Sequence, residues 1–380
     1  MHDPFSNREM LTQTGGDKTP QRLRLSLRAW QRLLSRIDGN ARIAWQTRFG
    51  YWLSGASHSL LARVQHASHA DKIRIASPSP PLFILGFWRS GTTFLHELFC
   101  CDLQFGFAST YACMNPSHFL LTEQWVRQRT PQQARRPMDS MRYSWISPQE
   151  DEFALLAFGA PSAYEALIVP SLMRDARALL DIRQLPPDEL NRWGKVLEYF
   201  IRLLTVQQGK KVVLKSPSHG FKLPILSTFF PLARYVIIER NPYEVFASNV
   251  RLWNTLVDMY GIESISSEEI EAFVLGAYVL HEEAIAEGVR RIDRRLIARV
   301  RYEQLVADPV ECMAQLYEEL ELGDFGAMRS RLQKYLTSVA DHTRNSFHLS
   351  PDQRQRVDSI WGELIDTKGY GWPRDRVAVG

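Results

Sequence analysis

The residues with the clearest chemical potential lie in segment 82–98, LFILGFWRSGTTFLHEL. An apolar run enters a turn that carries Gly86 and Gly91, and the chain leaves this turn in a pattern that predicts a helix beginning near Thr92. The N-terminus of such a helix presents unpaired backbone N–H groups and a partial positive charge. This layout is typical of a loop that binds a phosphate group.

The loop departs from the ATP-binding pattern G-x-x-x-x-G-K-[ST] at one position. Gly86, Gly91 and Thr93 fit that pattern. Thr92, however, stands where the lysine should be, and the nearest cation is Arg89, before the second glycine. A β,γ-phosphate pair with Mg²⁺ needs that lysine. The sequence therefore favours a phosphate ligand that binds outside the usual nucleoside triphosphate mode.

Four segments together resemble a known family. Residues 86–93 followed by Phe94 are similar to the 5'-phosphosulfate loop of sulfotransferases that use 3'-phosphoadenosine 5'-phosphosulfate (PAPS), where a Lys or Arg precedes Ser-Gly-Thr-Thr. Three more segments follow in the family's order: VVLKSPSHGFKLP at 212–224, ARYVIIERNPYEVFASNVRLW at 233–253 and ARVRYEQLVADP at 298–309. The resemblance covers most of residues 81–322. It implies transfer of a sulfuryl group from PAPS to a hydroxyl, without a metal ion.

The resemblance also implies which residues bind the donor. Arg89 would contact the 5'-phosphate and the bridging oxygen, where charge develops as the bond to sulfur breaks. Arg240 and Ser248 would hold the 3'-phosphate, which distinguishes PAPS from plain adenosine nucleotides. The family's C-terminal basic loop is not recognisable; segment 341–346 with Arg344 is the candidate replacement, and an ordinary solvated loop is the alternative. The full expected donor set is Gly86, Arg89, Ser90, Gly91, Thr92, Thr93, Phe94, Arg240, Ser248, Tyr302 and Arg344.

Two sources of a general base compete, because an acceptor hydroxyl must lose its proton as the new bond forms. His219 follows Lys215 in a segment that resembles the Lys-Thr-His stretch of cytosolic sulfotransferases, although three residues separate the pair here instead of one. Related glycan sulfotransferases use a carboxylate, which points to the acidic run Glu150, Asp151 and Glu152. The alternative is that these acids only stabilise the helix dipole at the start of a helix. Lys215 would orient the sulfuryl or bridging oxygens. We predict as catalytic residues His219, Lys215, Arg89 and Glu152.

These residues need a scaffold, and the chain predicts an α/β fold. Strand-like runs occur at 82–87, 211–215, 234–239 and 296–302, and all but the last are followed by a helical pattern. This alternation predicts a P-loop-like parallel sheet flanked by helices, with ligands at the C-terminal ends of the strands. Arg89, Lys215 and Arg240 lie at or just beyond such ends. We expect a disordered tail at 1–20, an Arg-rich helical extension at 21–75, and a sulfotransferase domain at 80–375 whose helical insertion, about 105–210, builds the acceptor pocket.

The N-terminal extension is unusually basic. Between residues 19 and 70 the chain has eight arginines, no lysine and one acid, Asp38. Apolar residues recur at helical spacing from residue 23 to 37, and the opposite face carries Arg24, Arg28, Arg32 and Arg36. We interpret this segment as a helix packed on the core with a solvated arginine face. Peripheral binding of residues 21–70 to anionic lipid and an electropositive mouth for an acidic acceptor are the alternatives.

Composition narrows the class of protein and its partners. A chain of 380 residues with 45% hydrophobic content can bury a full core. Its four cysteines have no metal-ligand spacing and residues 1–20 are polar, so we expect a cytoplasmic enzyme, with contact at the inner membrane face if the extension binds lipid. No nucleic-acid recognition motif accompanies the positive charge. The acceptor stays open between a small molecule, a lipid and a glycan, and the oligomeric state is not predicted. A P-loop kinase-like enzyme and a non-catalytic membrane-associated binding protein are the rival functions.

Overall fold

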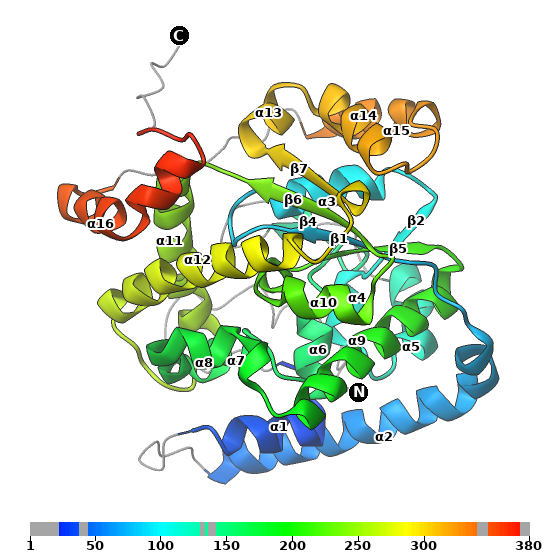
Figure 1. The fold of residues 1–380 in the computed structure, drawn as a ribbon. Helices are drawn as coiled ribbons and strands as arrows, with labels where there is room; N and C mark the ends of the chain where they lie inside the picture. Colours follow the sequence, from blue (N-terminus) through cyan, green and yellow to red (C-terminus); the bar gives the residue numbers. More distant parts are fainter. Residues whose placement is uncertain (1–22, 38–44, 130–133, 136–141, 340–348, 373–380) are drawn as a thin grey trace.

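The computed structural model describes residues 23–37, 45–129, 134–135, 142–339 and 349–372. At its centre is a five-stranded parallel sheet with the strand order β2-β5-β1-β6-β7 (Figure 1). The strands are β1 (Leu82–Leu85), β2 (Phe105–Phe107), β5 (Lys211–Lys215), β6 (Arg234–Glu239) and β7 (Ile297–Arg301). The predicted α/β fold with a parallel, helix-flanked sheet is confirmed. Strand β2 was missed because three residues are too few to show a period.

Helices cover both faces of the sheet, so its central strand is apolar throughout. All four residues of β1 are fully buried. Leu82 and Ile84 face a core built with the helices drawn above the sheet in Figure 1, which are α3 (Thr92–Cys100), α13 (Tyr302–Ala307), α14 (Pro309–Glu319) and α15 (Gly326–Ser338). Phe83 and Leu85 face a second core with α9 (Pro187–Gln208), α10 (Leu223–Phe229) and α12 (Ser267–Val289).

The interval between β2 and β5 is mainly helical, as expected. Its elements are α4 (Thr110–Met114), α5 (Phe119–Arg129), the two-stranded antiparallel pair β3 (Ala134–Arg135) and β4 (Arg142–Tyr143), α6 (Glu152–Phe158), α7 (Glu165–Ile168), the 3-10 helix η1 (Pro170–Asp175), α8 (Ala176–Leu180), the 3-10 helix η2 (Ile182–Gln184) and α9. A third core joins α6 and α7 to α11 (Pro242–Tyr260), α12 and α16 (Pro351–Thr367). The remaining short 3-10 helices are η3 (Pro217–Lys222) and η4 (Arg294–Leu296).

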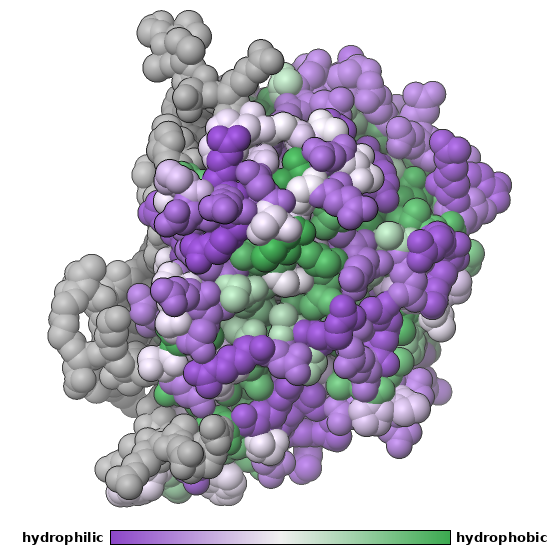
Figure 2. Space-filling model, turned by 60° about the vertical axis from the view of Figure 1, so that its left-hand side comes forward, coloured by the Kyte–Doolittle hydropathy of each residue, from purple (hydrophilic) through white to green (hydrophobic). Residues whose placement is uncertain are grey.

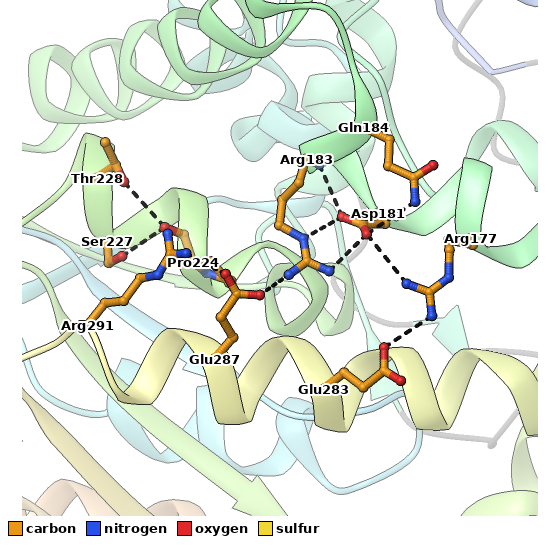
Figure 3. Close-up of polar contacts among 10 residues, drawn as sticks. All are labelled: Arg177, Asp181, Arg183, Gln184, Pro224, Ser227, Thr228, Glu283, Glu287 and Arg291. Carbon is orange, nitrogen blue, oxygen red and sulfur yellow. Dashed lines mark hydrogen bonds and ion pairs between the residues drawn. The ribbon is translucent and has the colours of Figure 1, made fainter.

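Ion pairs hold the helices of this interval against α12 (Figure 3). Arg183 Nε donates to Asp181 Oδ1 at 2.6 Å, and another guanidinium nitrogen of Arg183 pairs with Glu287 of α12. Arg177 bonds Glu283 at 3.2 Å. Burial favours a higher pKa for Asp181, but the hydrogen bond and charge of Arg183 outweigh it, so that the pKa of Asp181 is lowered. The network therefore fixes α8 and η2 beside the sheet.

The N-terminal extension consists of α1 (Leu27–Leu34) and the long helix α2 (Trp45–Ile75). Helix α1 packs directly on α6, because the Ser26 N–H donates to the carbonyl of Ala157 at 2.9 Å. Gly159 ends α6 with φ +77, and a Cβ there would lie 2.9 Å from the backbone nitrogen of Ala29. The expectation that the first helix packs on the core is confirmed. The tail at 1–20 lies outside the described residues.

The expected solvated arginine face of α1 is wrong. Arg32 Nε donates to Glu165 Oε1 at 2.9 Å, and its Nη1 donates to Glu189 at 2.6 Å. Arg36 pairs with the same Glu165, whose side chain is only 1% exposed. Arg24 Nη1 reaches Asn115 at 2.5 Å. Three of the four arginines thus join the extension to the helical interval instead of facing water.

Candidate functional site

The loop between β1 and α3 has the geometry of an anion cradle. Gly91 is the N-cap of α3 with φ +100, and a Cβ there would lie 2.3 Å from Tyr302 Cδ2. A Cβ on Gly86 would lie 2.6 Å from Ser90 Oγ and 2.8 Å from the carbonyl oxygen of Ile238. Gly91 is required by its backbone conformation, and both positions require glycine because neighbouring atoms leave no room for a side chain. The unpaired N–H groups of the first turn of α3 remain directed into the loop.

Arg89 adopts a conformation that is unusual for its residue type. Its φ of 66 lies in the left-handed region, which non-glycine residues adopt rarely. Such strain is retained where the surrounding contacts hold it, and it concentrates at functional sites. Here the Arg240 Nη1 donates to the Arg89 carbonyl at 3.2 Å, and Arg89 Nε donates to Ser248 Oγ at 2.8 Å. The backbone thereby turns the guanidinium of Arg89 toward α11.

Four residues expected at the donor thus meet in space. Arg89, Arg240 and Ser248 are linked by the contacts above, and the Arg240 guanidinium carbon lies 4.3 Å from the centroid of the Tyr302 ring. Glu244, in the first turn of α11, is a further neighbour and accepts from Arg240 Nε at 3.0 Å. An acid four residues after an arginine is an ordinary helix pair, so nothing in the sequence marks it as part of the site.

The remaining donor residues occupy different surroundings. Ser90 Oγ is buried and finds no hydrogen-bond partner within the described part of the chain, which fits a hydroxyl that serves a ligand. Thr92 is buried at the start of α3, and Thr93 accepts from Lys215 Nζ at 3.3 Å. Phe94, in the first turn of α3, packs against the core that α3 shares with α13, α14 and α15. Arg344 lies outside the described residues. The cradle, the two arginines and these hydroxyls together fit a donor that carries phosphates at both ends of its ribose.

A polar chain connects the cradle to the acidic run. Lys215 Nζ, at the end of β5, donates to Glu150 Oε1 at 2.8 Å as well as to Thr93. The hydroxyl of Tyr164 donates to the other oxygen of Glu150, and Trp88 Nε1 donates to Tyr164 at 3.3 Å. Burial raises the pKa of Tyr164 far above its usual value, and the charge of Glu150 raises it further, so Tyr164 stays a proton donor. Trp88 and Tyr164 are site residues that sequence reasoning missed.

The structure separates the three acids and disfavours two predicted catalytic residues. Glu150 has a side chain that is 17% exposed and lies beside Lys215. Glu152 is fully buried, where it binds Lys222 Nζ at 2.7 and 2.8 Å and accepts from Ser218 at 2.6 Å. Burial favours a higher pKa for Glu152, but Lys222 and its other partners outweigh this and lower it. Glu152 is therefore an interior ion-pair partner and is not placed to meet an acceptor.

His219 is equally enclosed. Its Nε2 lies 2.7 Å from Asp151 Oδ2, and neither side chain has any exposed surface. The ring also contacts Phe83 edge-on, with centroids 5.3 Å apart. Of the three residues between Lys215 and His219, Ser216 is the N-cap of the 3-10 helix η3, and Pro217 and Ser218 begin this helix, in which His219 is buried. This extra length is the physical reason that the expected Lys-Thr-His geometry does not form.

Buried aromatic residues pack around the Trp88 and Tyr164 end of this polar chain. The Trp88 ring lies 5.2 Å from both Phe221 and Trp253, measured between centroids. Phe153 of α6 packs on Tyr164 at 4.8 Å. Figure 2, in which the left-hand side of Figure 1 comes forward, shows apolar residues gathered in the middle of the face and hydrophilic residues around them. Glu150 therefore lies beside an aromatic cluster, which it contacts through Tyr164.

A second network of charged side chains lies next to the donor loop. Lys368, just after α16, donates to Glu239 at 2.7 Å and to Glu282 of α12 at 2.8 Å. Burial alone favours a higher pKa for Glu282, yet His281 and Lys368 lower it to about 2. Together with Ser90 and Arg240, these groups line a small cavity under the loop. These contacts fix the end of α16 to the end of β6, and Arg240 directly follows β6.

Within the described residues, no group of three or more His, Cys, Asp or Glu side chains is arranged to hold a metal ion. The cations near the cradle are side chains, namely those of Arg89, Lys215 and Arg240. The arrangement can bind a doubly phosphorylated nucleotide and places one carboxylate, Glu150, beside a buried lysine at the edge of the cradle.

Comparisons with known proteins agree with this arrangement. A family model described as "Sulfotransferase family" matches residues 80–325. The chain is 37% identical over 346 residues to the omega-hydroxy-beta-dihydromenaquinone-9 sulfotransferase Stf3 of Mycobacterium bovis and to that of Mycobacterium tuberculosis, and the alignments cover 90% of this chain and 89% of each relative. Among solved structures, sulfotransferase STF9 from Mycobacterium avium has a TM-score of 0.66 at 22% identity, covering 90% of this chain and 95% of that chain. Sulfotransferase STF1 from Mycobacterium tuberculosis has a TM-score of 0.55 at 18% identity, with 88% and 91% covered, and shares the fold.

Proposed function

The chain belongs to the sulfotransferase family, and from that premise we propose that it sulfates a hydroxyl at the end of a hydrophobic, lipid-like acceptor. It is an enzyme that transfers sulfuryl groups, with PAPS as the donor, as the sequence resemblance implied. The acceptor class is the new element. The relative Stf3 is named for a hydroxylated dihydromenaquinone, and the aromatic cluster of Trp88 and Tyr164 beside Glu150 supports an apolar acceptor.

The donor is held by residues from both ends of the site. The first turn of α3, Thr92 and Arg89 would bind the 5'-phosphate, and Arg240 with Ser248 would bind the 3'-phosphate. When bound, PAPS supplies a sulfuryl group already activated by its link to phosphate. Arg89 stabilises the charge that develops on the phosphate oxygen as the bond to sulfur breaks. Ser248 is 2% exposed and already accepts from Arg89, so the two sides of the site are connected before a donor arrives.

The pair of Glu150 and Lys215 is the observation that carries the proposed mechanism. The acceptor hydroxyl gives its proton to Glu150 while its oxygen bonds to sulfur, and the bond between sulfur and the phosphate oxygen breaks. Lys215, 1% exposed, forms an ion pair with Glu150 and lies beside Thr93 of the cradle. The Tyr164 hydroxyl fixes the other carboxylate oxygen, so that Glu150 is oriented before the acceptor binds.

Replacing the proposed base tests the mechanism. Glu150→Gln should lower kcat by roughly 10² to 10⁴, because loss of a general base acts on the transition state, while the affinity for adenosine 3',5'-bisphosphate (PAP) stays unchanged. His219→Gln should retain more activity than Glu150→Gln once its folding is confirmed by circular dichroism. The exposed Glu198→Gln on α9 is the matched control. An active Glu150→Gln enzyme beside a folded but inactive His219→Gln enzyme would return the role to the histidine.

The acceptor class can be tested without knowing the acceptor. The purified enzyme is incubated with sulfur-labelled PAPS and either a lipid extract or a water-soluble extract, and labelled products are identified by mass. We expect product from the lipid extract. Label that enters only water-soluble products would contradict a lipid-like acceptor while leaving the sulfotransferase activity intact.

We further propose that the division into an extension at 21–75 and a domain at 80–375 is functional, and that the enzyme works at a membrane surface. A lipid-like acceptor resides in a membrane, which supports the proposal that the enzyme works at a membrane surface. In the described parts of the chain, no helix combines the length and the apolar character that crossing a bilayer demands. Contact would therefore be peripheral.

A further inference from the structure

The outward face of α2 carries a stripe of large apolar side chains. Its members are Trp45, Phe49, Trp52, Leu53, Leu60 and Val64, each at least 45% exposed, and Trp45 reaches 72%. They follow one another at intervals of 4, 3, 1, 7 and 4 residues, which places them on one side of the helix. We call this set the α2 stripe. Isolated exposed apolar residues are ordinary, whereas a continuous row of this size marks an interaction surface.

The opposite face of α2 is firmly packed, so the stripe is held outward. Tyr51 stacks on Trp30 of α1 with centroids 3.8 Å apart. A Cβ on Gly55 would lie 2.9 Å from Leu27 Cα, which shows how closely the two helices approach. Farther along, Gln65 donates to the Pro116 carbonyl at 2.9 Å. The exposure of the stripe therefore does not come from a loose helix.

The shape of the stripe suits a flat apolar boundary. From Trp45 to Val64 it extends over about 28 Å at the helical rise per residue. Phe49 and Trp52 stack with centroids 6.2 Å apart, so part of the apolar surface is already assembled. Tryptophan has an apolar ring and a polar N–H, a combination enriched where lipid headgroups meet acyl chains.

The positive charge around the α2 stripe favours an anionic partner. Arg48 and Arg63 are exposed on α2, and Arg28 is exposed on neighbouring α1. Residues 45–70 contain no acidic residue. A second copy bound through a two-fold axis would bring the same arginines together with no acid on α2 between them to compensate. An anionic lipid surface would instead pair with these arginines while it takes up the apolar side chains.

We propose that the α2 stripe inserts into the headgroup region of an anionic membrane, with α2 parallel to the surface. The inference rests on the proposed lipid-like acceptor and adds the surface that delivers the enzyme to it. Helix α2 packs on α1, and α1 packs on α6, which directly follows Glu150 and Asp151. At usual helix spacings the proton acceptor then lies about 20 Å from the membrane. A terminal hydroxyl on a long chain can cover that distance while the rest of the acceptor stays in the bilayer.

Vesicle sedimentation of the full chain tests the proposal. Vesicles of phosphatidylcholine alone are compared with vesicles that also contain phosphatidylglycerol, and the wild type should sediment mainly with the second kind. The triple variant Trp45→Ser, Phe49→Ser, Trp52→Ser should bind at least about tenfold more weakly, since it loses most of the apolar area. Arg48→Glu with Arg63→Glu should remove the preference for phosphatidylglycerol. Trp125→Ser, which changes an exposed tryptophan on α5, should bind like the wild type.

Two further measurements separate this inference from the proposed function. The triple variant should keep its thermal shift with PAP and should still sulfate the acceptor in a detergent-dispersed lipid extract, because the stripe is not part of the donor or proton-transfer site. The proposal would be overturned if the wild type bound neither kind of vesicle, or if the triple variant sedimented like the wild type. A wild-type dimer in solution that the triple variant abolishes would also overturn it.

Discussion

At the residue scale, Arg240 is neutralised by its own neighbour. Glu244 accepts from Arg240 Nε at 3.0 Å, and the side chains are 27% and 13% exposed. An arginine that is to hold a 3'-phosphate must leave this carboxylate or share its donors with it. We therefore expect Glu244 to compete with the donor for Arg240 and to weaken donor binding.

Removing that competitor should tighten donor binding. A partly exposed ion pair of this kind contributes about 1 kcal/mol, so Glu244→Gln should lower the Kd of PAP by about fivefold. Isothermal titration measures the change, and the exposed Glu319→Gln on α14 is the control. Unchanged or weaker binding by Glu244→Gln would show that the carboxylate assists the arginine instead of competing with it.

The two arginines should differ in what they recognise. Arg240→Ala should abolish the preference for PAP over AMP, because it removes a charge-assisted contact worth about 1.5–3 kcal/mol with the 3'-phosphate. Arg89→Ala should weaken both nucleotides, since it contacts the phosphate that they share. Thermal shifts with each nucleotide give the comparison. A preference for PAP that survives Arg240→Ala would place the 3'-phosphate elsewhere.

At the element scale, the extension is joined to the catalytic part through buried polar contacts. Glu165 of α7 accepts from both Arg32 and Arg36 of the first helix. On α2, His58 stacks against His118 with ring centroids 5.6 Å apart, and His118 contacts Thr122 at 2.9 Å. These contacts join α1 and α2 to the helical interval, so the extension is not a loose appendage.

The ion pairs predict a stability effect far from the reacting groups. Glu165→Ala leaves two partly buried guanidinium groups without this partner, and should lower the free energy of unfolding by about 3 kcal/mol, the lower end for a broken buried pair, because Arg32 keeps Glu189. Glu165→Gln retains hydrogen-bond acceptors and should lose less. Urea unfolding measures both. Equal loss in the two variants would mean that charge contributes little.

The histidine pair predicts a pH dependence. Burial and then the charge of Arg24 lower the pKa of His58 to about 4; for His118, burial is again the largest cause, followed by the charges of His58 and Arg24, and its pKa is also about 4. Because the unfolded value is 6.5, the unfolded chain binds more protons between these limits. The stabilisation is complete above pH 6.5 and is lost as the pH falls toward 4.

Melting temperatures between pH 7.5 and 4.5 test this directly, with the double variant His58→Phe, His118→Asn as the comparison. The wild type should lose more stability than the double variant over this range, because only it carries the two groups that are buried neutral. Parallel curves for the two proteins would contradict the assignment.

The sequence predicted the sheet and donor loop better than the surroundings of the proton acceptor. Strands such as β1 and the turn with Gly86 and Gly91 are local patterns. The partners of Arg32, by contrast, lie 133 and 157 residues away, so no helical pattern could reveal them. The choice among Glu150, Asp151 and Glu152 could not be made from the sequence for a similar reason. Neighbouring carboxylates at a helix start point in different directions, and only packing decides which one meets Lys215.

At the scale of the whole molecule, the site should recognise a nucleotide by both of its phosphate groups and without Mg²⁺. PAP at 100 times its Kd stabilises the fold by about 2.7 kcal/mol, and EDTA should not change the thermal shift. AMP should give less at equal concentration. Greater stabilisation by ATP with Mg²⁺ than by PAP would revive the kinase-like alternative and count against the donor assignment.

The docking of the extension also has a consequence for biosynthesis. Arg36 leaves the ribosome 129 residues before its partner Glu165, a delay of about 6–26 s at about 5–20 residues per second. During that interval Tyr51 of α2 can already stack on Trp30 of α1, but contacts with later segments, such as that of Gln65 with Pro116, have not formed. If the α2 stripe binds lipid headgroups as proposed, the nascent chain can meet a membrane before its catalytic sheet has been synthesised.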